Sequence, residues 1–292
     1  MNSQNKFVHK SLQQYLLEAK EKKVAIGHFN ISNSDGFWAV VLGAKELNLP
    51  VIIGASEGER DFIGVRELAA MVHAYRESTG QPVFLNADHT YSFDRVKEAV
   101  DAGYDAVIFD GTEMSYEENI ATTKKSVEYA KSVNPNIIVE AEIGFIGKSS
   151  KVLDVVPEGV GRLTTVDEAV NFVKETGVAM LAPAVGNVHG MVKGGEPDLN
   201  IERIKEIADA VKIPIVLHGA SGNTVEDIRA AIKAGVNIIH INTELRVAFR
   251  SGLVKSLQED PDQVAPYKYL KGARIAMQKV VEEKLKLFNN IV

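Results

Sequence analysis

Cysteine is absent from this chain of 292 residues. Its absence excludes disulfide bonds and thiolate ligands, so any metal ion must be held by imidazole or oxygen groups. Long apolar runs are absent as well, because no stretch approaches the ~20 residues that cross a bilayer, and we expect no membrane partner. Residues 1–6 lead into no hydrophobic core of the kind that marks a secretory signal. These absences predict a cytoplasmic protein.

Excess positive charge is missing too, since the formal net charge is −6 at pH 7. This balance argues against a nucleic-acid partner bound through bulk charge. A phosphorylated ligand would have to be held by local cations and backbone N–H groups. The hydrophobic fraction of 45% is ordinary for a globular chain. Composition shows no linker-like shift and no convincing short repeat, so we expect a single domain over residues 1–292.

Short β-branched runs alternate along the chain with stretches of helical period, which is typical of a parallel sheet covered by helices. The expected strands are 24–28, 51–54, 83–86, 106–109, 137–140, 178–182, 214–217 and 237–241. Eight such units favour a (β/α)8 TIM barrel. A doubly wound sheet would need a glycine-rich fingerprint after its first strand, and Gly27-His28-Phe29-Asn30 does not supply one.

Two further helical patterns lie outside the eight units. One, over residues 11–22, precedes the first strand, and a long one, over residues 266–288, follows the last unit. The long C-terminal pattern exceeds what barrel closure requires. It is expected to cap the barrel or to contact a second subunit.

Three expected strands run into histidine, at His89, His189 and His218. The carboxyl ends of barrel strands open onto one mouth, so three imidazoles there outline a metal site. Asp88 directly precedes His89, and a continuing strand would send the two side chains to opposite faces. We therefore expect the strand to end before them. A rival interpretation makes Asp88 the N-cap of the next helix.

Ordered motifs run nearly end to end through the chain. They are Phe29-Asn30, Val51-Ile52-Ile53, Ser56-Glu57-Gly58, Asp88-His89, Asp110-Gly111-Thr112, Glu118-Asn119-Ile120, Glu140-Ala141-Glu142-Ile143-Gly144, His189-Gly190 with Lys193, His218-Gly219-Ala220-Ser221-Gly222 and Thr243-Glu244-Leu245. In this order they resemble the class II, metal-dependent fructose-bisphosphate aldolases. The resemblance implies cleavage of fructose 1,6-bisphosphate to dihydroxyacetone phosphate and glyceraldehyde 3-phosphate.

The resemblance also implies a cofactor and a proton shuttle. One Zn²⁺ held by His89, His189 and His218 would serve as the electron sink for the enediolate, and an additional monovalent cation is allowed. Asp88 would exchange the proton of the C4 hydroxyl. Glu142, with Asp110 and Glu140, would orient the metal-binding histidines or offer an alternate metal position, and plain structural hydrogen bonds remain an alternative. We count Glu142 among the catalytic candidates.

Two groups of residues are expected to bind the substrate phosphates. For the triose phosphate they are the backbone N–H groups of Gly190, Gly219 and Ser221, the helix start at Asn242 and Thr243, and the point charge of Lys193. For the distal phosphate, the resemblance points to Ser56 and Arg246, with a solvated helix arginine as the alternative. Asn30 is a further candidate for binding the substrate. Lys268 is the cation that a neighbouring subunit would contribute.

The chain departs from the family pattern at several places, among them Asn242, where relatives carry an acidic or small residue, and Ala265-Pro266-Tyr267-Lys268, where many carry an acid and an arginine. His240 stands where relatives usually carry an asparagine that contacts the triose, so it is expected to contact substrate rather than to be a fourth imidazole ligand. The long loop 143–163 reads Ser149-Ser150-Lys151 where relatives often have an acid. A loop of this length is typical of a lid. Asp154 and Glu158 are the candidates for exchanging the triose proton.

Three other functions remain open from the sequence. Tagatose 1,6-bisphosphate differs from the fructose substrate at one stereocentre. A metal-dependent hydrolase could use the same imidazoles to activate water, but it would not need the phosphate-binding turns. A non-catalytic sugar-phosphate binding barrel would retain ligand without turnover. For the aldolase we expect ketose bisphosphate and triose phosphates as partners, a role in glycolysis and gluconeogenesis, and a homo-oligomer, dimer or tetramer.

Overall fold

Eight parallel strands close into a barrel in the computed structural model, which describes residues 10–291. The strands are β1 (Ile26–Asn30), β2 (Val51–Ala55), β3 (Val83–Thr90), β4 (Ala106–Phe109), β5 (Ile138–Ile143), β7 (Met180–Pro183), β9 (Ile215–Leu217) and β10 (Val236–Ile241). Their order around the barrel is β1-β10-β9-β7-β5-β4-β3-β2. The predicted (β/α)8 barrel is therefore confirmed. Residues 1–6, on which the expectation of no secretory signal rests, lie outside the described range.

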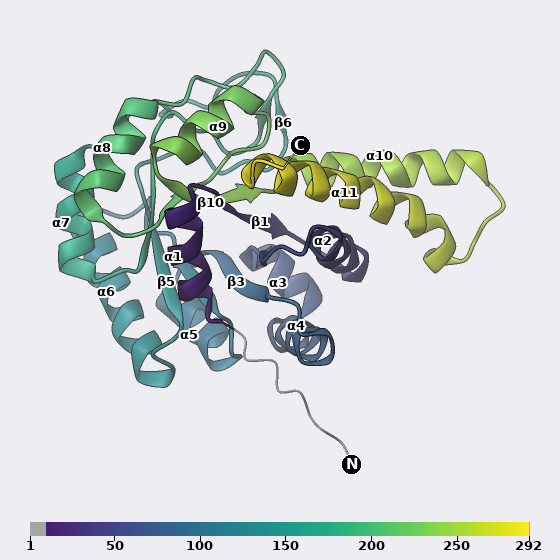
Figure 1. Cartoon of the computed structure of the whole chain (residues 1–292), viewed down its shortest axis with the longest axis horizontal. Coiled ribbons are helices and arrows are strands. Elements are labelled where there is room, and N and C mark those ends of the chain that lie inside the picture. The colour runs from purple at the N-terminus through teal and green to yellow at the C-terminus, as the bar shows by residue number, and fades with distance from the viewer. Residues whose placement is uncertain (1–9, 292) are drawn as a thin grey trace.

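Helices surround this barrel (Figure 1). They are α1 (Leu12–Lys22), α2 (Ser34–Leu47), α3 (Glu57–Ile63), α4 (Val65–Thr79), α5 (Phe93–Asp101), α6 (Tyr116–Val133), α7 (Val166–Thr176), α8 (Ile201–Val211), α9 (Val225–Ala234), α10 (Thr243–Glu259) and α11 (Pro266–Phe288). Ser56 and Ser115 begin α3 and α6 with capping boxes, in which a glutamate three residues on accepts the backbone N–H of the cap. Over the described residues, no helix is long and apolar enough to cross a membrane.

The barrel interior changes from apolar to polar along its axis. In β1, alternate residues share a face, so Ile26, His28 and Asn30 all point inward. Ile26 belongs to an apolar cluster with Leu12 and Leu16 of α1, whereas Asn30 lines a cavity at the other end. Helix α1 therefore closes the end opposite the mouth. This gradient leaves the mouth free for polar chemistry.

Helices α10 and α11 form a hairpin that extends away from the barrel (Figure 1). The end of α11 returns to the barrel wall, where Leu285 and Phe288 are buried and the backbone N–H of Ala25 donates to the carbonyl of Phe288. Helix α11 packs along α2 and α10. The C-terminal helix was expected to cap the barrel, but α1 closes the barrel end and α11 lies on the outer wall.

A small two-stranded sheet was not predicted. It pairs β6 (Val152–Leu153) with β8 (Met191–Val192) and so joins the loop after β5 to the loop after β7. The backbone N–H of His189 donates to the carbonyl of Ile146 beside it. Strands of two residues are too short to show a periodic pattern, so no signal for them is present in the sequence. The sheet holds the long loop against the segment that carries His189.

Candidate metal centre and active site

A cavity of about 210 Å³ opens at the carboxyl ends of the strands. Among its lining residues are the following predicted ones: Asn30, Ser56, Asp88, His89, Asp110, His189, Gly190, His218, Gly219, Ser221, His240, Asn242, Thr243 and Arg246. These residues come from segments spread over most of the chain. The fold thus brings most of the predicted site residues to one place.

Strand β3 differs from the prediction at Asp88 and His89. The strand does not end before them but continues to Thr90, so that expectation was wrong. Its pairing with β4 shifts register between Ala87 and Thr90, and His89 has a φ of 43°. An irregularity of this kind re-aims side chains, so both residues face the mouth. Ser92 caps α5, which removes the rival N-cap role of Asp88.

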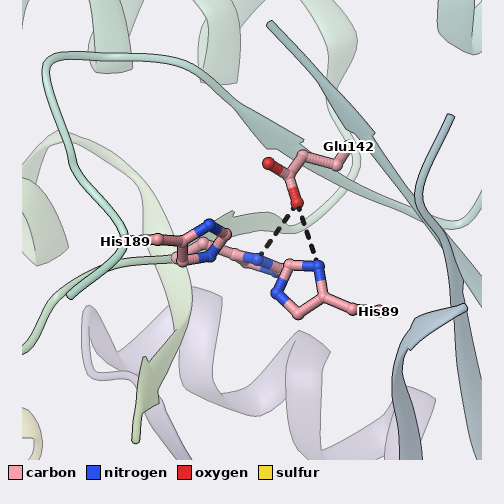
Figure 2. A group of neighbouring side chains, drawn as sticks. His89, Glu142 and His189 are labelled. Carbon is pink, nitrogen blue, oxygen red and sulfur yellow. Dashed lines mark ion pairs between the residues drawn. The ribbon is translucent and has the colours of Figure 1, made fainter. Parts of the chain in front are cut away.

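The three predicted imidazoles meet at this mouth. Ring centroids lie 4.7 Å apart for His89 and His189, 5.0 Å for His89 and His218, and 5.7 Å for His189 and His218. One ligand atom from each of the three, with a carboxylate oxygen of Glu142, all lie within 4.8 Å of one another. Figure 2 shows Glu142 facing His89, with His189 beside them. Four donors this close fit one divalent ion.

Each imidazole is oriented by a hydrogen bond from one ring nitrogen. His89 Nδ1 lies 2.9 Å from Asp110 Oδ2, His218 Nε2 lies 2.8 Å from Glu140 Oε1, and His189 Nδ1 lies 2.7 Å from the carbonyl of Gly147. Such partners fix which nitrogen carries the proton and leave the other free to bind a metal. The predicted orienting role of Asp110 and Glu140 agrees with these contacts.

Two buried atoms at this point lack hydrogen-bond partners. His218 Nδ1 and Glu142 Oε2 are 3.4 Å apart, and neither makes a hydrogen bond with any described residue. Unpaired buried polar atoms are costly, so a site that keeps them is built for another ligand. The residues therefore fit a bound cation. Glu142 belongs to this donor set, in keeping with its predicted alternate metal position.

The three histidines predicted to bind a metal have perturbed pKa values. Burial alone would lower the pKa of His89, but the charge of Asp88 and the hydrogen bond to Asp110 raise it to about 9. Burial and the charge of His89 lower the pKa of His189 to about 4. Burial also opposes the charged form of His218, yet Glu140 and Glu142 hold its pKa well above the usual value. A cation at this site would have to displace protons.

Asp88 is buried and held from several sides. Its Oδ2 accepts from Asn30 Nδ2 at 2.8 Å, and its Oδ1 lies 3.4 Å from His240 Nδ1. Arg60 donates to its backbone carbonyl at 2.9 Å. Although burial favours the neutral acid, the neighbouring histidines keep the pKa of Asp88 well below its usual range. The side chain is thus a positioned proton acceptor.

His240 stacks on a histidine that the sequence analysis did not assign to the site. The rings of His28 and His240 are 3.4 Å apart and 2° from parallel, because the two residues are register neighbours on β1 and β10. Ring lone pairs lie in the ring planes, so stacked rings cannot both direct one at a shared ion. His240 lines the cavity, whereas His28 is fully buried beneath it. This geometry fits a substrate-facing His240.

Glycine turns and a helix start surround the cavity on the side of His218. Gly219 has a φ of 58°, and a Cβ there would lie 2.2 Å from the carbonyl oxygen of Val188. No other residue fits that turn without a backbone shift. Asn242 and Thr243 begin α10, whose free N–H groups favour an anion. The turns and the helix start together can hold a phosphate.

The predicted distal phosphate residues have an unexpected partner, Glu59. Arg246 NH2 lies 2.6 Å from Glu59 Oε1, and the Oγ of Ser56 donates to Glu59 Oε2 at 2.9 Å. Arg246 also contacts the hydroxyl of Ser150 on the long loop. Glu59 was missed because its place in a capping box reads as purely structural.

Several predicted residues lie outside the cavity. Lys193 and Asp154 were both expected in the cavity. Instead, the Nζ of Lys193 pairs with Asp154 at 2.6 Å on the exposed surface, and neither side chain reaches the cavity. Glu158 is exposed away from it as well, and Lys268, which is expected to act from a neighbouring subunit, is exposed outside this chain's own cavity. Two described residues that were not predicted line the cavity instead. They are Lys148 of the long loop and Tyr91, which directly follows β3. Neither was predicted, because a lysine or tyrosine in a loop carries no pattern.

Comparisons with known proteins agree with this geometry. A family model described as "Fructose-bisphosphate aldolase class-II" matches residues 10–291. A fructose-bisphosphate aldolase of Staphylococcus aureus (strain Mu50) is 38% identical over 281 residues, 95% of this chain and 96% of the relative. One from Geobacillus stearothermophilus is 38% identical over 283 residues, 96% of each chain. The crystal structure of the YdjI aldolase from Escherichia coli K12 has a TM-score of 0.81 at 32% identity, covering 95% of this chain and 96% of that one.

Proposed function

The chain belongs to the class II fructose-bisphosphate aldolase family, and we propose that it cleaves fructose 1,6-bisphosphate reversibly to dihydroxyacetone phosphate and glyceraldehyde 3-phosphate. Members of this family are metal-dependent lyases. The observation that carries the proposal is the convergence of His89, His189, His218 and Glu142 within 4.8 Å. Asp88 lies beside this group, so an electron sink and a proton acceptor share one cavity.

Zinc is the ion that we propose for the site. Imidazole-rich sets of four donors are typical of Zn²⁺, and the chain has no cysteine to favour a softer ion. A divalent cation bound there would polarise the C2 carbonyl and stabilise the negative charge that develops when the C3–C4 bond breaks. Asp110, Glu140 and the carbonyl of Gly147 would keep the three ligand nitrogens aimed at it.

Asp88 is the residue that we propose to take the proton of the C4 hydroxyl. Removal of that proton lets C4 become an aldehyde carbonyl while the electron pair of the C3–C4 bond stays with the triose half. Asn30 donates to one carboxylate oxygen, and His240 Nδ1 lies 3.4 Å from the other, which has no hydrogen-bond partner among the described residues. The side chain is therefore fixed before substrate arrives, which lowers the cost of proton transfer.

The triose phosphate is proposed to lie against the turns at Gly190, Gly219 and Ser221 and the start of α10. Backbone N–H groups there would hold the phosphate without requiring excess positive charge on the surface. The Lys148 side chain of the long loop also lines the cavity, with its Nζ paired with Glu113. Fixing this phosphate would place C2 and C3 next to the imidazoles.

An assay of metal-loaded and chelated protein tests the function. Both forms are incubated with fructose 1,6-bisphosphate and, in parallel, with tagatose 1,6-bisphosphate, and triose phosphate release is followed. We expect cleavage of the fructose substrate, its loss on chelation and its return with Zn²⁺. Faster cleavage of tagatose 1,6-bisphosphate would identify that sugar, in place of fructose 1,6-bisphosphate, as the preferred substrate. No release from either sugar by the Zn²⁺-loaded protein would exclude the aldolase function.

The same family membership supports a wider proposal. We place the enzyme in the cytoplasm, in glycolysis and gluconeogenesis, as one catalytic domain over residues 1–292. A homo-oligomer, dimer or tetramer, is supported by apolar side chains exposed on the α10–α11 hairpin, where Val254, Leu257 and Tyr267 are 39%, 43% and 77% exposed. Light scattering on the purified protein measures this state directly.

A further inference from the structure

A second chamber of about 130 Å³ adjoins the main cavity. Asn30 and Arg246 line both spaces, so the two meet at these side chains. Phe249 and Met277 form part of an apolar wall in the second chamber. Asn30 also donates to Asp88, the proposed proton acceptor at C4. The chamber therefore lies where the substrate chain beyond C4 would extend.

Glu59 stands at the junction of the two spaces. It is only 6% exposed, and both carboxylate oxygens are engaged. Oε1 accepts from Arg246 at 2.6 Å, and Oε2 accepts from Asn30 Nδ2 at 2.9 Å and from the backbone N–H and Oγ of Ser56 at 2.8 and 2.9 Å. The donors that could hold a distal phosphate thus already hold a carboxylate.

Charge at this end of the site is balanced as a result. Arg246 is the one cation and Glu59 the one carboxylate among the described residues that line the second chamber. A phosphate placed on Arg246 would lie close to the like charge of Glu59, which weakens its binding. Hydroxyl groups, in contrast, can donate to Glu59 and accept from Arg246 and Asn30 together. The junction suits an uncharged polyol better than a dianion.

We propose that Glu59 sets the specificity for the aldehyde half, and that the enzyme also cleaves ketose 1-phosphates without a distal phosphate. The products would be dihydroxyacetone phosphate and a neutral hydroxyaldehyde. Asp88 takes the C4 hydroxyl proton, and the C3–C4 bond breaks with its electron pair left on C3. C3 then takes up a proton from water and Asp88 returns its proton to water, so that protons balance. This inference rests on the proposed aldolase function and names a further substrate class for the same site.

A purely structural role for Glu59 is the competing explanation, since the residue completes the capping box of α3. Glutamine keeps that role, because its amide oxygen still accepts the Ser56 N–H. Glu59→Gln therefore removes the negative charge and leaves the cap. The chain offers a matched control in Glu118, the exposed capping-box glutamate of α6, which lies outside both chambers.

The experiment compares fructose 1,6-bisphosphate with fructose 1-phosphate in the full-length, Zn²⁺-loaded protein. We expect wild type and Glu118→Gln to cleave both sugars. In Glu59→Gln, kcat/KM for the bisphosphate relative to the monophosphate should rise by about tenfold or more, because a like charge next to the phosphate has been removed. Thermal unfolding of each variant checks that the fold is kept.

Arg246→Gln is a second variant, and it is expected to change the ratio of kcat/KM values in the opposite direction. It leaves the charge of Glu59 unbalanced, so the ratio should fall below that of wild type. An unchanged ratio in both variants, or no cleavage of fructose 1-phosphate by wild type while the bisphosphate is cleaved, would overturn this inference alone. Cleavage of neither sugar by any form would remove the aldolase function and the inference with it.

Discussion

Asp88 takes its role from its neighbours. Asn30 donates to one of its oxygens, His240 lies close to the other, and nearby histidines keep its pKa low despite burial. Asp88→Asn keeps the shape but removes the proton acceptor. We expect kcat to fall by about 10²–10⁴-fold with the bound zinc unchanged. Steady-state cleavage and metal analysis on the same preparation measure both, and wild-type turnover by the fully loaded variant would show that another residue accepts the proton.

His28 makes a residue-scale prediction through its stacking on His240. A Cβ added at Gly54 would lie 2.1 Å from His28 Cε1, so Gly54→Ala must displace the ring. We expect it to lower the free energy of unfolding by about 1–3 kcal/mol, as overpacking does, and to reduce turnover as His240 shifts. The cost should be smaller in a His28→Ala background, where no ring is struck. Equal costs in both backgrounds, measured by urea unfolding, would contradict this contact.

His89 links metal binding to pH. In the metal-free protein its pKa is raised from 6.5 to about 9, so its proton stabilises the fold fully below pH 6.5 and this contribution is lost as pH rises through 9. Metal binding requires the unprotonated ring. Apparent zinc affinity should therefore rise by about tenfold or more per pH unit between 6.5 and 9. A competing chelator measures it, and affinity independent of pH across this range would refute the assignment.

Among the elements, helix α1 closes the end of the barrel opposite the cavity. Leu16 is 1% exposed and packs with Ile26 and Phe84 against the inner floor, far from the mouth. Leu16→Ala should lower the free energy of unfolding by about 2–5 kcal/mol. Turnover of the folded fraction should stay within about twofold of wild type, since the floor and the mouth are separate layers. Denaturant unfolding and kinetics at low temperature measure the two effects, and a large drop in turnover with unchanged stability would reverse this role.

Elements long enough to repeat their apolar pattern several times were predictable from the sequence, and short or irregular elements were not. The helix over 266–288 appears with those bounds, because its apolar residues recur every four positions. The predicted end of strand β3 came too early in the chain. The strand continues through a register shift after Ala87, and that shift depends on the pairing of β3 with β4. Strands β6 and β8 form only because the loop after β5 and the loop after β7 lie side by side. No local sequence pattern predicts that contact.

At the scale of the whole molecule, closure of the barrel creates the site. The sequence predicted His89, His189 and His218 because each ends an apolar strand, a signal visible one segment at a time. It did not reveal the His28–His240 stack, which exists only because β1 closes beside β10. The contact between Glu59 and Arg246 was not visible either, since Arg246 comes from the other end of the chain.

The central claim is that one divalent ion, held by His89, His189 and His218, is required for aldol cleavage. Titration of chelated protein with Zn²⁺, while triose phosphate release from fructose 1,6-bisphosphate is followed, tests it most directly. Turnover should rise in proportion to added metal and level off at about one ion per chain. Full turnover in the metal-free protein, or titration of a His218→Ala variant to the same plateau with the same stoichiometry, would contradict the claim.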